Sequence, residues 1–261
     1  MAALHVAGRS LTLDAVSSEI TELFSDVWLG TELWPAARAL IDTLEKYKQD
    51  ALQSSTLVLE LGAGTGACGL AAAVLGARRV LLTDKESLLP TLQANVAANG
   101  LAEGRVQCDT LAWRAEGLHP TTLVDGADII LASDCLNPVY GNEHAAALAA
   151  TIRDTLLRAR NAREQHHASG SAGTEPEALL AQTSRGEEVA EAVFFDACKR
   201  LGLRVTLQRR VWVGHDGVVM RSVSCGSSAD VGTSAGAATD EPPSEAAHRV
   251  AIYVITLGTS S

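Results

Sequence analysis

The stretch from Leu57 to Leu70, LVLELGAGTGACGL, limits the possible folds more than any other part of the chain. It starts with a short apolar run that is typical of a buried strand, and it ends with small residues that are typical of a helix. The glycines between them, Gly62, Gly64 and Gly66, allow a sharp turn and a close approach of another group to the backbone. The stretch therefore predicts a strand, a tight turn and a helix, which together begin a β-α-β unit.

The alternation of strand and helix continues along the chain. Strands are expected at 56–60, 79–84, 105–113, 127–134, 177–183, 203–213 and 249–257. Helices are expected from Pro35 onward and at 67–77, 85–100, 142–160 and 186–202. Because this alternation indicates a parallel sheet with helices on both faces, we predict an α/β, Rossmann-like fold with a seven-stranded, mostly parallel sheet. The last two strands have no helix between them, so we expect them to pair as an antiparallel C-terminal hairpin.

The length and composition suit one domain. The chain has 261 residues, of which 47% are hydrophobic, and this is enough for one sizeable core. We therefore expect a single domain over residues 1–261, with an N-terminal hairpin and helix within residues 1–50. Residues 161–176 and 215–247 are rich in Gly, Ser, Ala and Pro and poor in large apolar side chains, which predicts flexible surface insertions.

Charge and cysteine usage argue against several classes of function. The formal net charge of -10 disfavours binding to the phosphates of nucleic acid. The five cysteines lie far apart without a metal-binding spacing, so we predict no metal site and a reducing compartment. The chain has neither a secretory signal pattern nor a run of about eighteen apolar residues that could cross a membrane. We expect a monomer in the cytoplasm or nucleus.

The glycine turn has the features of a site for an adenosine-containing cofactor. In an open α/β sheet, ligands bind beyond the carboxyl ends of the strands, where the strand order reverses. Gly62, Ala63 and Gly64 would lie there. Asp84, about 20 residues further on at the end of the next strand, could accept hydrogen bonds from both hydroxyls of a ribose. The pattern G-x-G-x-x-A would suit a nicotinamide or flavin nucleotide, and the glycines could also serve only as a packing turn.

Three features favour S-adenosyl-L-methionine over those alternatives. Glu60 comes just before the turn and could face the positively charged methionine end of this cofactor. The turn has the form E-x-G-x-G-x-G. The C-terminal strand pair has no place in the usual dinucleotide fold. We therefore predict that the chain binds S-adenosyl-L-methionine.

The order of several motifs resembles that of the seven-strand protein lysine methyltransferases known as methyltransferase family 16. The motifs span about residues 29–205 and read TELWPAARAL, LVLELGAGTGACGL, LLTDKESLLPTLQANVAANG, LAW, DIILASD and RGEEVAEAVFFDACKRLGL. This resemblance implies a class I methyltransferase fold, S-adenosyl-L-methionine as methyl donor, and a lysine side chain of a protein as acceptor. It also implies that Trp34, Trp113 and Ser133 line the cofactor pocket.

Transfer of a methyl group to lysine needs an amine that is unprotonated and held in line with the methyl carbon. A free lysine has a pKa of about 10.4, which burial and a nearby sulfonium lower. Asp134, at the carboxyl end of the strand 127–134, is expected to orient the amine. The family has D-x-x-Y at this place, whereas this chain reads DCLNPVYGNE. Either Asn137 replaces the tyrosine, or a short insertion displaces it to Tyr140, which we favour.

The loop that follows Asp134 is also compatible with two other functions. The letters NPVY resemble the N-P-P-Y loop of enzymes that methylate adenine or glutamine amides, although in those enzymes the asparagine directly follows the fourth strand, where Asp134 stands here. A small-molecule acceptor belongs to the same alternative. A binding module that keeps the cofactor fold without turnover would also explain the departure from D-x-x-Y, and it would bind the cofactor weakly or not at all.

Overall fold

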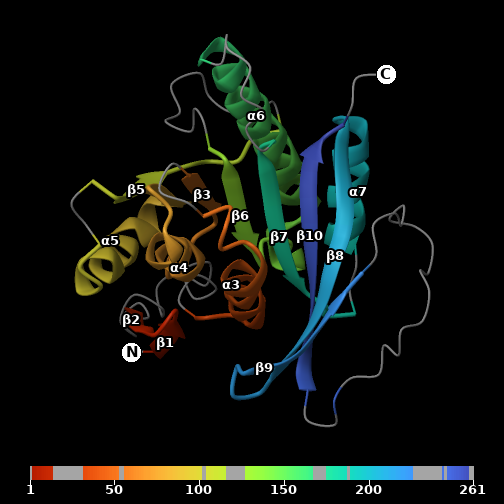
Figure 1. Cartoon of the computed structure of the whole chain (residues 1–261). Coiled ribbons are helices and arrows are strands. Elements are labelled where there is room, and N and C mark those ends of the chain that lie inside the picture. The colour runs from red at the N-terminus through yellow and green to blue at the C-terminus, as the bar shows by residue number, and fades with distance from the viewer. Residues whose placement is uncertain are drawn as a thin grey trace.

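The computed structural model describes residues 2–13, 32–52, 56–101, 104–115, 127–166, 175–186, 189–225, 243 and 246–258. Its centre is an eight-stranded sheet with the order β5-β4-β3-β6-β7-β10-β8-β9 (Figure 1). The strands are β3 (Leu57–Leu61), β4 (Arg79–Asp84), β5 (Val106–Thr110), β6 (Ile129–Ser133), β7 (Glu177–Thr183), β8 (Leu203–Gly214), β9 (Val219–Ser224) and β10 (Ala246–Leu257). Neighbouring strands from β5 to β7 are parallel, whereas β10 is antiparallel to both β7 and β8. The predicted α/β, mostly parallel sheet and the antiparallel C-terminal pair are confirmed.

The helices form two layers around this sheet. They are α3 (Pro35–Tyr47), α4 (Ala67–Leu75), α5 (Leu89–Ala98), α6 (Asn142–His166) and α7 (Val189–Arg200), with short 3₁₀ turns η1 (Glu86–Leu88) and η2 (Pro138–Tyr140). Helices α3, α4 and α5 cover one face, and α6 and α7 cover the other (Figure 1). Successive side chains of a strand point to opposite faces. In β3, Val58 therefore packs on the α4 side, while Leu59 and Leu61 pack on the α6 side.

A hairpin of β1 (Ala2–Val6) and β2 (Arg9–Leu13) forms a second, two-stranded sheet beside α4 and α5. Its four apolar side chains join the core on the α4 side of the main sheet, namely Leu4, Val6, Leu11 and Leu13. Asn99, at the end of α5, holds β2 through two hydrogen bonds with the backbone of Thr12, of 2.9 and 2.7 Å. The predicted N-terminal hairpin and the helix from Pro35 are thus present, and both pack on the layer that carries the glycine turn.

The predicted number of seven strands is wrong by one, because β9 lies inside the segment 215–247 that was expected to be a flexible insertion. The strand β8 continues to Gly214 and turns back through Asp216 and Gly217, where the Asp216 carboxylate accepts the Val218 N–H at 3.0 Å. An Asp-Gly pair between two strand-like runs is a hairpin signal. Segment 215–247 therefore begins with an ordered hairpin, and the remainder, 226–242 and 244–245, lies outside the described residues.

The prediction of a flexible insertion at 161–176 is also wrong for the first residues of that range, because α6 continues to His166. Arg163, on this last part of the helix, forms an ion pair with Asp128 just before β6. This ion pair beside the core sheet stabilises the extension of α6 through a polar sequence. Residues 167–174 lie outside the described residues.

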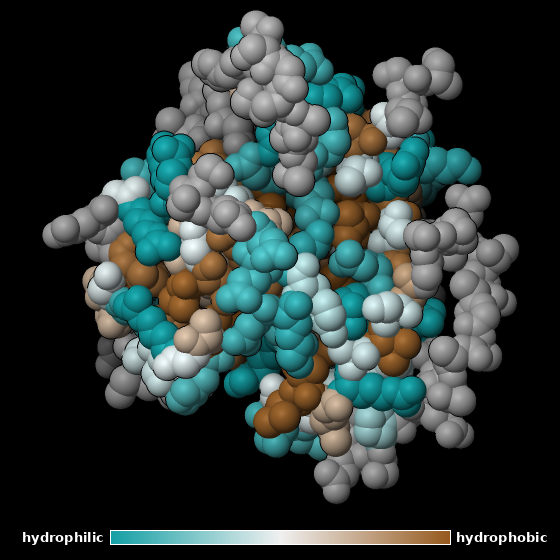
Figure 2. Space-filling view, viewed as in Figure 1, coloured by the Kyte–Doolittle hydropathy of each residue, from teal (hydrophilic) through white to brown (hydrophobic). Residues whose placement is uncertain are grey.

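The surface is mixed in character. On the face shown in Figure 2, apolar atoms appear in separate patches between hydrophilic side chains. Among the described residues, no helix is both long and apolar enough to cross a membrane.

Candidate active site

The strand order reverses between β3 and β6, because the chain passes from β3 to β4 and β5 on one side and then returns to β6 and β7 on the other. The carboxyl ends of these strands surround a cavity of about 310 Å³. Such a crevice is the usual ligand site of an open α/β sheet. Every residue that the sequence predicted for the site lines this cavity: Trp34, Glu60, Gly62, Ala63, Gly64, Asp84, Trp113, Ser133, Asp134, Asn137 and Tyr140.

The glycine turn forms the floor of the cavity with bare backbone. Gly62, Gly64 and Gly66 have φ angles of 64°, 53° and 79°, in the left-handed region that favours glycine. A Cβ atom on Gly62 would lie 3.2 Å from the ring of Trp113 and 3.0 Å from the sulfur of Cys135. The turn is therefore held against these two side chains, and any larger residue at Gly62 would displace them.

Glu60 is buried beneath the first turn of α4. Its Oε2 accepts the N–H of Gly69 at 2.7 Å, and a Cβ atom on Gly69 would lie only 2.2 Å from Leu82. Burial raises the pKa of Glu60 to about 8, although the hydrogen bond from Gly69 acts in the opposite direction. Near neutral pH the carboxyl group of the free protein is therefore mostly protonated. A cation bound beside it would favour the ionised form.

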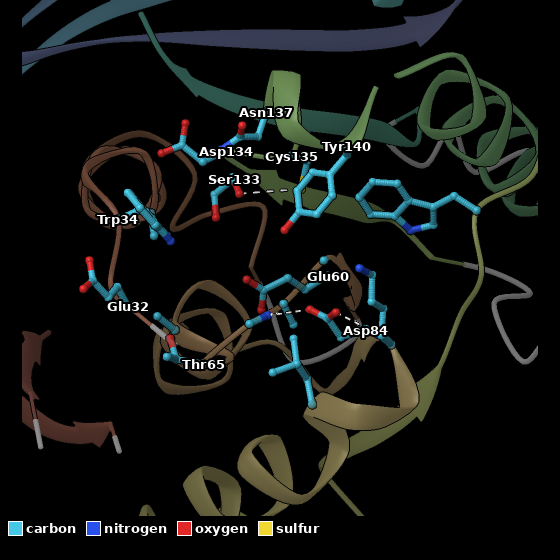
Figure 3. Close-up of a pocket in the computed structure, with 18 of the residues that line it drawn as sticks. Glu32, Trp34, Glu60, Thr65, Asp84, Ser133, Asp134, Cys135, Asn137 and Tyr140 are labelled. Carbon is cyan, nitrogen blue, oxygen red and sulfur yellow. Dashed lines mark hydrogen bonds between the residues drawn. The ribbon is translucent and has the colours of Figure 1, made fainter. Parts of the chain in front are cut away.

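Asp84 closes the glycine turn from the end of β4. Its Oδ2 accepts the N–H of Gly64 at 2.8 Å, and its Oδ1 accepts the N–H of Lys85 at 2.7 Å (Figure 3). Burial raises the pKa of Asp84, while these two hydrogen bonds and the charge of Lys85 lower it. The carboxylate is thus oriented by backbone donors and lies at the edge of the cavity.

A stack of aromatic rings forms one wall of the cavity. The ring centroids of Trp113 and His144 are 4.5 Å apart, and those of His144 and Tyr140 are 4.8 Å apart. The ammonium of Lys85 lies 5.1 Å from the centroid of Tyr140. Burial, followed by the charge of Lys85, lowers the pKa of His144, which favours the neutral imidazole. This wall offers flat, largely uncharged surfaces, as an adenine base requires.

Asp134 follows β6 with a φ of 52°, which aspartate tolerates better than most residues. Its side chain is only 4% exposed. Its Oδ1 accepts the backbone N–H of Thr183 at 2.9 Å and Arg185 Nη1 at 3.0 Å, and its Oδ2 accepts the hydroxyl of Thr183 at 2.8 Å. The carboxylate is therefore fixed by groups at and beyond the end of β7.

The structure separates the two candidates for the family tyrosine. The side-chain oxygen of Asn137 accepts the N–H of Val139 at 3.1 Å, and its backbone carbonyl accepts the N–H of Tyr140 at 3.0 Å. Asn137 thus stabilises the turn η2. Tyr140 points its hydroxyl into the middle of the cavity, whereas Asn137 lies beside Asp134 at one end (Figure 3). This geometry favours Tyr140 as the functional aromatic residue, although both residues line the cavity.

Sequence reasoning did not find several residues that complete the cavity. They include Glu32, Thr65, Lys85, Cys135, His144 and Arg185. His144 lies in the first turn of α6, close to the loop that carries Asp134 and Tyr140, and this proximity in the sequence was a usable signal. Burial raises the pKa of the Cys135 thiol, so this residue is an apolar part of the wall and not a nucleophile. Arg185, which comes from beyond β7, is the first residue of the motif RGEEVAEAVFFDACKRLGL, but nothing in that motif indicates a contact with Asp134.

A second cavity of about 470 Å³ adjoins the first and shares Glu32, Trp34 and Arg185 with it. The guanidinium of Arg185 lies 5.8 Å from the ring of Trp34. Further lining residues come from α3, from the β8–β9 turn and from β10, including Arg38, His215, Asp216 and His248. The site is therefore open on the side of Arg185 toward the antiparallel part of the sheet.

The strand order, the glycine turn and the acids at the ends of two strands define a Rossmann-like α/β protein with a nucleotide-type crevice. The family described as lysine methyltransferase matches residues 15–162, which is more than half of the chain. The chain belongs to this family, as the resemblance of its motifs indicated.

The chain is similar to several curated lysine methyltransferases. It is 36% identical to protein N-lysine methyltransferase METTL21A of Danio rerio, over 57% of this chain and 66% of that protein. It is 32% identical to EEF1A lysine methyltransferase 3 of Mus musculus, over 67% of this chain and 65% of that protein. Among solved structures, magnesium protoporphyrin IX methyltransferase from Synechocystis is 12% identical, with a TM-score of 0.49 and coverage of 89% of this chain and 86% of that one. The chain spans less than two thirds of the length of both curated relatives.

Proposed function

We propose that the protein is an S-adenosyl-L-methionine-dependent methyltransferase that modifies a lysine side chain of a protein. The observation that carries this proposal is the convergence of two acids, Asp84 and Asp134, on one cavity at the reversal point of the sheet. Asp84 lies beside the glycine turn and suits a ribose, and Asp134 lies at the end of β6 and suits an amine. Membership of the lysine methyltransferase family supports this assignment.

The residues around the glycine turn fit the cofactor. Asp84 would accept hydrogen bonds from the ribose hydroxyls, and the stack of Trp113 and His144 would bind the adenine. Glu60 would face the positively charged methionine end. Because burial raises the pKa of Glu60 to about 8, we expect binding of this cation near neutral pH to release a proton.

When bound, the cofactor supplies a methyl group on a positively charged sulfur, and the amine nitrogen of the substrate replaces that sulfur on the carbon. The chain contributes orientation and a suitable protonation state. The acceptor oxygens of Asp134 hold an N–H of the amine, and the hydroxyl of Tyr140 lies across the cavity from them. A partly enclosed site disfavours the ammonium form, so less free energy is needed to deprotonate the lysine.

The contacts of Asn137 support a lysine acceptor over an amide or a base. In enzymes with an N-P-P-Y loop the asparagine directly follows the strand, whereas here Asp134 follows β6 and the oxygen of Asn137 accepts the N–H of Val139 in the turn η2. We therefore propose a protein, and not a nucleic acid, as the substrate. The cytoplasmic or nuclear location and the monomeric state stay predictions.

The proposal is tested by transfer of labelled methyl from S-adenosyl-L-methionine into a lysate from which this protein has been deleted. Native protein is compared with Asp134→Ala, and Asp196→Ala serves as a matched control because Asp196 is exposed on α7. Labelled protein is then hydrolysed to identify the methylated amino acid. We expect methyl-lysine with native protein and with Asp196→Ala, but not with Asp134→Ala.

Other outcomes would redirect the proposal. Methyl-glutamine in place of methyl-lysine would support the amide alternative. Measurable cofactor binding without any labelled protein would contradict a protein substrate. Absence of cofactor binding by the folded native protein would support a binding module instead of an enzyme.

A further inference from the structure

The charge of Asp134 raises a problem for the proposed reaction. A lone carboxylate beside a lysine favours the protonated ammonium, because opposite charges stabilise each other. Methyl transfer needs the neutral amine. An acid that orients the amine therefore opposes the effect of the cofactor sulfonium, which favours the neutral amine, unless the charge of the acid is balanced by another group.

The structure supplies that balance in Arg185. Its Nη1 donates to Oδ1 of Asp134 at 3.0 Å, and the Arg185 side chain is 29% exposed whereas that of Asp134 is 4% exposed. A guanidinium remains protonated at all working pH values, so the pair has no net charge. The ring of Trp34 below Arg185 further limits where the guanidinium can lie.

The hydrogen bonds leave a place for the amine. Each carboxylate oxygen can accept about two hydrogen bonds. Oδ1 accepts two, from the Thr183 N–H and from Arg185, whereas from the described residues Oδ2 accepts only the Thr183 hydroxyl. Oδ2 thus retains capacity for one N–H of a substrate.

We propose that Arg185 is a positioning residue that cancels the charge of Asp134, so that Asp134 accepts a hydrogen bond from the substrate amine without holding the amine in its protonated form. This inference rests on the proposed lysine methyltransferase function and explains how an acid and a deprotonated amine are compatible in one site. It assigns a function to a residue for which the motif that contains it, RGEEVAEAVFFDACKRLGL, implied none.

Other charged and titratable groups face this region, but none of those described has the same contact. The first cavity is also lined by Glu32, Glu60, Asp84, Lys85, Cys135, Tyr140 and His144, and the second by Arg38, His215, Asp216 and His248. Lys85 lies over Tyr140 at the Asp84 end. Among the described cations, Arg185 alone forms an ion pair with Asp134.

The test compares pH profiles of native protein, Arg185→Gln and Arg185→Lys in the deletion lysate. The lysate is concentrated until the initial rate of methyl-lysine formation no longer depends on its concentration, so the rate reports kcat and the pKa values of the enzyme–substrate complex. Arg200→Gln is the matched control, because it removes the same charge from an exposed position on α7. Cofactor binding by each variant is measured separately to show that the fold and the cofactor site are intact.

For Arg185→Gln we expect the acidic limb of the profile to move upward by about one to two pH units, since the uncompensated charge of Asp134 then stabilises the ammonium form of the bound lysine. The rate then falls by about tenfold or more near pH 7 and approaches the native rate near pH 9 to 10. Arg185→Lys keeps the charge and should keep the acidic limb near its native position. Arg200→Gln should match the native profile.

Three results would overturn the inference. Arg185→Gln could lose activity equally at every pH, which indicates a structural role only. The acidic limb of Arg185→Gln could stay in place or move to lower pH. The acidic limb of Arg185→Lys could move as far upward as that of Arg185→Gln. These results differ from failure of the proposed function, in which native protein forms no methyl-lysine at any pH.

Discussion

Two aspartates, Asp84 and Asp134, stand at the ends of two strands of the same sheet and line the same cavity. Both are largely buried, but they are held in different ways. Asp84 accepts hydrogen bonds from the backbone N–H groups of Gly64 and Lys85. Asp134 depends on the hydroxyl of Thr183 and the guanidinium of Arg185, in addition to one backbone N–H. The backbone donors around Asp84 suit recognition of a ligand. The charge balance between Asp134 and Arg185 suits a group whose protonation must be controlled.

The largest effect that tests this comparison is expected for Asp134→Asn. The amide keeps the shape of the side chain but leaves the partly exposed Arg185 without its counter-charge. We expect kcat/KM for methyl-lysine formation to fall by at least about 100-fold, or about 2.7 kcal/mol of transition-state stabilisation. Calorimetry should give a cofactor Kd within about twofold of native, because Asp134 lies at the amine end. An equal loss of cofactor affinity would contradict the separation of the two acids.

Gly69→Ala should reveal how closely the Asp84 end depends on bare backbone. An added Cβ would lie 2.2 Å from Leu82 and 2.8 Å from Glu60 Oε2. We expect the free energy of unfolding to fall by about 2 kcal/mol, because overpacking outweighs the helix preference of alanine. Denaturant titration measures this loss.

A double-mutant cycle is the control for that prediction. In a Leu82→Ala background the nearest atoms are absent, so Gly69→Ala should cost less there than in native protein. Equal costs in both backgrounds would mean that the packing of α4 against β4 is not the cause.

Asp84→Ala should weaken cofactor binding by more than about tenfold, or about 1.4 kcal/mol, because both the ribose acceptor and the anchor of the Gly64 N–H are lost. Equilibrium binding of S-adenosyl-L-methionine measures this effect. At saturating cofactor we expect kcat to stay within about threefold of native. An unchanged Kd would exclude Asp84 as the ribose acid.

The smallest effect concerns Glu60, on the same side as Asp84. Its pKa in the folded protein, about 8, is above that of an unfolded glutamate, so the folded state binds the proton more tightly. The contribution of Glu60 to the free energy of unfolding is fully present below about pH 4.5 and is lost as the pH rises toward 8. Relative to Glu60→Gln, native protein should lose about 1 kcal/mol of unfolding free energy between pH 6 and pH 7, inside this window. Parallel stability curves of the two proteins would show that Glu60 does not titrate there.

The Asp84 end was predictable because its determinants are local. The turn at Gly62 and Gly64 is visible as glycines, and Asp84 follows at a spacing set by one β-α-β unit. The sheet was predictable for the same reason, since each strand and helix has its own apolar pattern. The strand β9 was missed because only half of its six residues are apolar and it opens a segment rich in Gly and Ser, although the Asp216-Gly217 pair marks its turn.

The Asp134 end was predictable only in part. Asp134 and Tyr140 are found from the sequence because they lie in or near a family motif. Thr183 and Arg185 lie 49 and 51 residues after Asp134 and contact it only because β7 pairs with β6. The choice between Asn137 and Tyr140 also depended on the geometry of η2, in which the asparagine side chain is used by the backbone. Such contacts arise from tertiary structure, so no local pattern contains them.

The position of β10 has a consequence for how the sheet forms. This last strand lies between β7 and β8, so the hairpin of β8 and β9 has no strand pairing with the parallel half until residues 246–257 are in place. During synthesis, β7 and β8 would each present an open edge until the last strand leaves the ribosome. Open edges invite pairing with other chains. We therefore expect the interval before β10 inserts to be the stage of folding at which the protein is most prone to aggregate.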